Sequence, residues 1–112
     1  MRNSQYWRTR PPDKLRHERT LLYRAGHKPD IAGHGHQYLD AFDIVVVRIG
    51  THKREAIETA GIEPGDLPTL RLPTFEPDYL WIRRNETTEE LLRLWREYGE
   101  SGGWEIGLLK AI

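Results

Sequence analysis

Eighteen residues, Gly26 to Asp43, hold the side chains in this sequence that are best suited to binding a metal ion. The stretch reads GHKPDIAGHGHQYLDAFD and is rich in imidazoles and carboxylates, which are ligands for zinc, manganese or nickel. One candidate function is therefore a metal-dependent phosphodiesterase or nuclease. Its divalent metal, such as zinc or manganese, would be bound by His27, His34, His36 and Asp40.

The residues around His34 and His36 favour a loop over a strand. On a strand, a His-x-His pair would point both imidazoles to one side, because side chains alternate between the two faces. Here Gly33 precedes the pair and Gly35 separates its members, which is typical of a loop. Spacing in a loop does not fix the geometry of metal ligands. The preferred interpretation is therefore a solvated loop in a protein without a cofactor.

Length and composition indicate one folded domain. The chain has 112 residues, of which 38% are hydrophobic and 30% charged, and it has no cysteine that could form a disulfide or bind zinc. No apolar run approaches the ~18 residues that cross a bilayer, and the first residues lack the apolar segment of a secretory signal. We therefore expect a cytoplasmic protein with no membrane partner. The scarcity of Asn and Gln leans toward a thermophilic source.

The net charge of zero hides an uneven distribution along the chain. Residues 1–28 hold eight Lys and Arg against two acids, whereas residues 29–112 hold nine against fifteen. A basic segment of this kind indicates an arm that binds an anionic partner, either nucleic acid or an acidic protein. The alternative is that the segment lies against the acidic part of its own chain or of a second copy.

Aromatic residues accompany these positive charges. Tyr6, Trp7 and Tyr23 lie among the arginines of the N-terminal segment, where their rings could stack on bases. Further along, Trp81 and Arg83 would share one face of a strand, which is how RNA-binding sheets present stacking rings. The residues expected to contact nucleic acid are Arg2, Trp7, Arg8, Arg10, Lys14, Arg16, Arg19, Arg24, Trp81 and Arg83.

From Ala41 onward, the hydrophobic pattern predicts strands and helices in alternation. Branched apolar runs indicate strands, proline permits only an edge strand, and apolar residues three and four apart indicate helices. The predicted elements are a strand over 42–50, a helix over 51–61, an edge strand over 69–72, a strand over 78–85, a helix over 87–101 and a strand over 104–112. This βαββαβ order predicts an α+β protein with a ferredoxin-like core over about 41–112.

Residues 1–40 are predicted to form a basic N-terminal arm outside this core. Within it, RTLLYRAG (residues 19–26) could add a strand at a sheet edge, and the histidine-rich loop follows. The segment before that strand is basic and has two adjacent prolines, so we expect it to become ordered only against a surface.

Two functions other than catalysis fit this organisation. The preferred one is a small binding or regulatory protein, of the size of phage or mobile-element factors, that engages nucleic acid through the basic arm. The second is a structural subunit, in which the aromatic face around Trp81 packs against another copy, so that we also expect a homo-oligomer. An enzyme is the less favoured interpretation.

Overall fold

The computed structural model describes residues 3–29, 35–52 and 72–112, and within them the chain forms an α+β fold. The strands are β1 (Ser4–Trp7), β2 (Arg19–Arg24), β3 (Ile44–Val45), β4 (Arg48–His52), β5 (Leu72–Phe75) and β6 (Tyr79–Arg83). The helices are the 3₁₀ helix η1 (His36–Asp40), α2 (Glu86–Gly102) and α3 (Trp104–Ala111).

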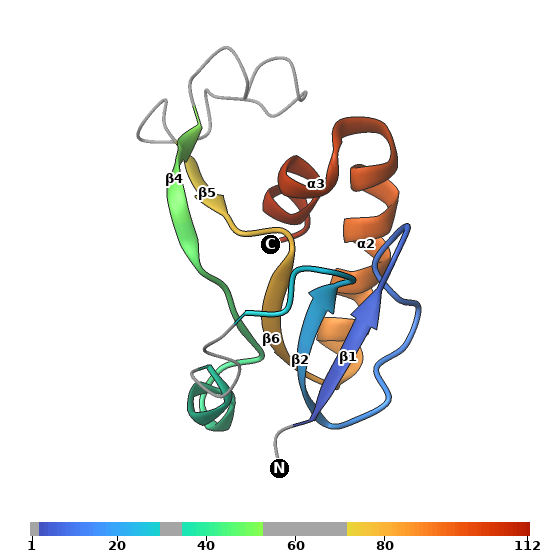
Figure 1. Cartoon of the computed structure of the whole chain (residues 1–112), viewed down its shortest axis with the longest axis vertical. Helices are drawn as coiled ribbons and strands as arrows, with labels where there is room; N and C mark the ends of the chain where they lie inside the picture. Colours follow the sequence, from blue (N-terminus) through green and yellow to red (C-terminus); the bar gives the residue numbers. More distant parts are fainter. Residues whose placement is uncertain (1–2, 30–34, 53–71) are drawn as a thin grey trace.

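The larger of two sheets has four strands in the order β1-β2-β6-β3. β1 and β2 run parallel, whereas β6 runs antiparallel to both of its neighbours. β4 and β5 form a separate two-stranded antiparallel sheet, seen in green and yellow on the left of Figure 1. Strands distant in the sequence are therefore neighbours in the larger sheet.

Helices α2 and α3 lie together on one side of the four-stranded sheet (Figure 1). Leu22 of β2, with Leu80 and Ile82 of β6, packs in one core with Trp95 of α2 and Leu108 of α3, and all five are fully buried. Their burial removes apolar surface from water, which is the main favourable term in folding. On the opposite face of the sheet, Leu39 of η1 packs against Leu21 and Trp81.

The first forty residues contribute strands to the same sheet as the rest of the chain. The strand predicted over 19–26 is confirmed as β2, but it lies between β1 and β6 and not at an edge. Trp7 of β1 and Leu15 in the following loop are buried in the core with Trp95. The predicted arm over 1–40, separate from a core over 41–112, is therefore not confirmed, because apolar residues inside the basic segment anchor it.

The C-terminal segment is a helix, and the predicted strand over 104–112 is wrong. Helix α3 packs against α2 so closely that a Cβ atom on Gly107 would lie 2.6 Å from the Cα of Gly99. The indole Nε1 of Trp95 donates a hydrogen bond of 2.8 Å to the carbonyl oxygen of Trp104. Gly103 turns the chain between the helices with a φ of 91°, a conformation that favours glycine.

The ferredoxin-like order is not confirmed, because the segment predicted to form its last strand folds as helix α3. The predicted strand over 42–50 is divided between β3 and β4, which belong to different sheets. Thr51 and His52 continue β4, so the helix predicted over 51–61 does not start there, and the rest of that prediction lies outside the described residues. The predicted edge strand over 69–72 overlaps β5 at Leu72, and its residues 69–71 lie outside the described residues.

Two predicted elements agree well with the structure. The strand over 78–85 is β6, and the helix over 87–101 is α2, which begins one residue earlier. Asn85 caps this helix: its side chain accepts a hydrogen bond from the backbone N–H of Thr88, whose hydroxyl accepts one from the N–H of Asn85. No helix in the described part of the chain is long and apolar enough to cross a membrane.

Candidate nucleic-acid interface

The sheet face turned away from α2 and α3 carries side chains in three cross-strand rows. Side chains alternate along a strand, so every second residue of β2 and of β6 points to this face. From one end to the other, the register pairs Arg19 with Arg83, Leu21 with Trp81, and Tyr23 with Tyr79. β1 extends the last row, because Tyr6 stands opposite Tyr23. Trp81 and Arg83 thus share one face, as predicted, and Tyr79 lies on it with them.

The middle row is covered by η1 of the same chain. Leu39 is fully buried against Leu21 and Trp81, and Trp81 itself is 1% exposed. The residue before η1, Gly35, lies so close that a Cβ atom there would be 2.2 Å from the Trp81 ring. Gly35, in the glycine-rich part of the histidine segment, therefore allows the backbone to approach an indole ring.

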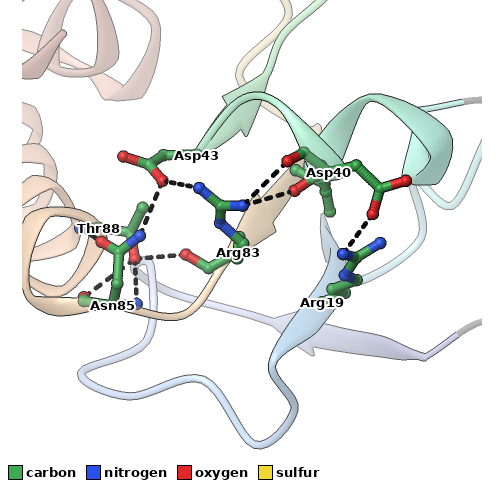
Figure 2. Close-up of polar contacts among 7 residues, drawn as sticks. Arg19, Asp40, Asp43, Arg83, Asn85 and Thr88 are labelled. Atoms are coloured by element: carbon green, nitrogen blue, oxygen red, sulfur yellow. Dashed lines mark hydrogen bonds and ion pairs between the residues drawn. The ribbon is translucent and has the colours of Figure 1, made fainter.

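The first row is tied to the residues around η1 by hydrogen bonds (Figure 2). The guanidinium of Arg83 donates to Asp43 Oδ1 at 2.7 Å and to the carbonyl oxygen of Leu39 at 3.0 Å. Asn85 donates to the same Asp43 oxygen at 2.8 Å, and Arg19 forms an ion pair with Asp40. Both arginines of this row are thus neutralised within the chain.

Asp43 joins β3, β6 and the start of α2. The hydrogen bonds from Arg83 and Asn85 hold the pKa of Asp43 below its usual range, although partial desolvation opposes them. A lowered pKa in the folded state means that the carboxylate stabilises the fold above the pKa of the unfolded chain. That contribution is lost as the pH falls through the pKa of the folded state.

The third row, which we call the tyrosine row (Tyr6, Tyr23 and Tyr79), has one half-exposed ring, Tyr6, beside two partly buried rings. Tyr6 is 51% exposed, and its ring centroid lies 6.2 Å from that of Tyr23. The guanidinium of Arg8 lies 5.2 Å from the Tyr6 centroid, and the ammonium of Lys28 lies 5.7 Å from that of Tyr23. Exposed rings can stack on flat groups, and the adjacent cations can bind phosphates.

The cations of the basic N-terminal segment, residues 1–28, divide into two sets. Arg10 pairs with Glu100, Arg19 with Asp40 and Arg24 with Asp78, so these cations meet acids from later in the chain. The alternative in which the basic segment lies against its own chain therefore applies to them. A second set forms no ion pair with any residue that the structure describes: Arg8, Lys14, Arg16 and Lys28. Arg2 lies outside the described residues.

The two tryptophans predicted to contact bases are buried. Trp7 is 4% exposed and packs edge-on against Trp95 and Trp104, with ring centroids 5.7 and 5.8 Å away. Trp81 is sealed by η1, so neither ring can receive a base in this structure. The prediction took Trp81 as exposed because alternation gives the face of a residue and cannot show what covers that face. Within the tyrosine row, Tyr6 is the exposed ring.

The two described histidines of the predicted metal site, His27 and His36, have different surroundings. Nδ1 of His27 lies 3.4 Å from a carboxylate oxygen of Asp78, and the imidazole is half-exposed. His36 is buried within η1, whereas His34 lies outside the described residues. Among the residues that the structure describes, no three histidine or acidic side chains are grouped to hold a metal ion. The metal site stays a prediction that depends on His34.

Comparison with known proteins supplies no role that could be transferred to this face. Comparison finds no family model, no curated protein and no solved structure that matches this chain. By its own geometry, the face combines a covered apolar centre, an internally neutralised arginine row, and a tyrosine row with an exposed Tyr6 and two adjacent cations.

Proposed function

We propose that this protein binds nucleic acid through the tyrosine row and the cations beside it, in a regulatory or accessory role without catalysis. The observation that supports this function is the Tyr6–Tyr23 pair, in which each ring has its own cation, Arg8 or Lys28. Aromatic rings next to positive charges offer a nucleic acid both of the contacts it needs, to bases and to phosphates.

Electrostatics favours the tyrosine row over the rest of the face. At the opposite end of the face, Asp40 and Asp43 form ion pairs with the guanidinium groups of Arg19 and Arg83. A phosphate that binds there would have to displace a carboxylate. Arg8 has no such acid among the described residues. Phosphate contacts therefore fall at the edge formed by β1 and at the end of β2.

The exposed rings distinguish nucleic acid from an acidic protein as the partner. Carboxylates would use only the cations, and a half-exposed Tyr6 would add little to their binding. Bases have flat faces that stack on tyrosine, a contribution of about 1–3 kcal/mol per base. The position of Tyr6 beside Arg8 is thus better explained by a ligand that has both phosphates and rings.

The double substitution Arg8→Gln with Lys28→Gln is expected to weaken binding and its salt dependence together. Each lost phosphate contact reduces the slope of log affinity against log salt by about 0.7–0.9, so two reduce it by roughly 1.5. Fluorescence anisotropy of a labelled oligonucleotide, titrated with protein at several NaCl concentrations, measures both quantities.

Arg93→Gln is the matched control for charge. Arg93 is an exposed cation on α2 that pairs with Glu90 and Glu97. Exposed pairs of this kind are worth about 1 kcal/mol or less, so the fold is retained. The slope should not change in this variant. An affinity indifferent to salt, or an equal loss from Arg93→Gln, would contradict the proposed function.

A further inference from the structure

Resting on the proposed function, we infer that the ligand is single-stranded nucleic acid, RNA or DNA, whose bases stack on the tyrosine row. The row crosses three adjacent strands, from Tyr6 on β1 through Tyr23 on β2 to Tyr79 on β6. Neighbouring strands are about 4.8 Å apart, and the rings of Tyr6 and Tyr23 lie side by side with centroids 6.2 Å apart. A single-stranded nucleic acid that crosses β1, β2 and β6 would pass Tyr6, Tyr23 and Tyr79 in that order.

The row offers aromatic rings for stacking, which favours a single strand over a duplex as the ligand. A base can stack on tyrosine only when its own face is free, whereas the faces in a duplex are covered by neighbouring base pairs. A duplex would offer only phosphates to Arg8 and Lys28. Half-exposed Tyr6 at the sheet edge would then contribute nothing to affinity.

Arg8 and Lys28 lie where each can give up its contact with a tyrosine ring and contact a phosphate instead. In the free protein, Arg8 lies over the Tyr6 ring and Lys28 over the Tyr23 ring. A base that stacks on either ring takes the place of its cation. Both side chains are exposed and can rotate within nanoseconds, which brings the charge to the phosphate that flanks the base. The same two residues thus serve both states.

The covered part of the face limits the binding path to this one row. Leu39 seals the middle row over Trp81, and beyond it Arg19 and Arg83 are already paired with Asp40 and Asp43. The nucleic acid is therefore guided across the strands at the Tyr6 end of the sheet. It has no open route along the strands toward Arg83.

The test compares three labelled probes by fluorescence anisotropy: a 12-nucleotide oligouridine RNA, a 12-nucleotide oligothymidine DNA and a 12-base-pair duplex. We expect at least one single strand to bind about tenfold or more tightly than the duplex. Tyr6→Leu should lower the affinity for that strand about tenfold, whereas Tyr6→Phe, which keeps the ring, should retain it. The single strand that binds more tightly shows whether the ligand is RNA or DNA.

Tyr38→Leu is the matched control, because Tyr38 on η1 is 45% exposed but lies outside the row. It should leave every affinity unchanged. A duplex that binds as tightly as the single strands would overturn the inference and leave the proposed function standing. A Tyr6→Leu variant that binds as the wild type would overturn both the inference and the role of the tyrosine row in the proposed function. Failure of all three probes to bind would overturn the proposed function itself.

Discussion

Trp81→Ala is expected to lower the free energy of unfolding by about 3–5 kcal/mol, the usual cost of truncating a buried tryptophan. The Trp81 side chain is 1% exposed and lies between Leu21 and Leu39, with Gly35 against its ring. Alanine would leave a cavity that the rigid sheet cannot close. Because domains of this size are stable by only about 5–15 kcal/mol, urea denaturation followed by circular dichroism should show a large fall in the midpoint.

Tyr6→Ala provides the contrast for this prediction. Tyr6 is half-exposed, so its loss should cost about 1 kcal/mol or less, mainly from its contacts with Arg8 and Tyr23. If both alanine variants were equally stable, the η1 cover over Trp81 would be contradicted. The two results together separate the aromatic residues that hold the fold from those that are free to bind.

Gly107→Ala is expected to destabilise the protein by about 2–3 kcal/mol, through crowding between α2 and α3. The added Cβ would lie 2.6 Å from both Cα and N of Gly99 and 3.1 Å from the carbonyl oxygen of Trp95. All three are backbone atoms, so no flexible side chain can move aside and α3 itself must shift. Alanine's better helix propensity, about 1 kcal/mol, offsets only part of this cost.

Gly102→Ala is the matched control for Gly107→Ala. A Cβ on Gly102 meets only Ile106 Cγ2, at an ordinary contact distance of 3.8 Å. Thermal denaturation should therefore give an unchanged or slightly higher melting temperature for this variant. A Gly107→Ala protein as stable as the Gly102→Ala protein would show that α3 does not pack on α2 as described.

The regular elements with strong local signals could be predicted from the sequence, and those decided by long-range contacts could not. Helix α2 has an apolar face and a polar N-cap close in sequence, so its pattern is clear. Residues 104–112 form an apolar run too short to distinguish a strand from a buried helix. The choice is made by the contact between Gly99 and Gly107, which no local pattern reveals.

The candidate site was predictable in its residue types but not in its location. The sequence drew attention to Tyr6 and Tyr23 beside basic residues, and the structure places these two rings side by side. That contact depends on parallel pairing of β1 with β2, across a loop whose length gave no sign of it. Trp81 shows the converse, because its face was predicted correctly while its cover by η1 was not.

The central claim is that nucleic acid binds on the tyrosine row, and mapping the contact by NMR tests it most directly. Backbone amide spectra of the ¹⁵N-labelled protein would be recorded while a 12-nucleotide oligouridine or oligothymidine is added. We predict the largest shift changes at Tyr6, Arg8 and Tyr23, with little change at the exposed face of α2 around Arg93. Changes centred on α2, or none anywhere at saturating oligonucleotide, would contradict the claim.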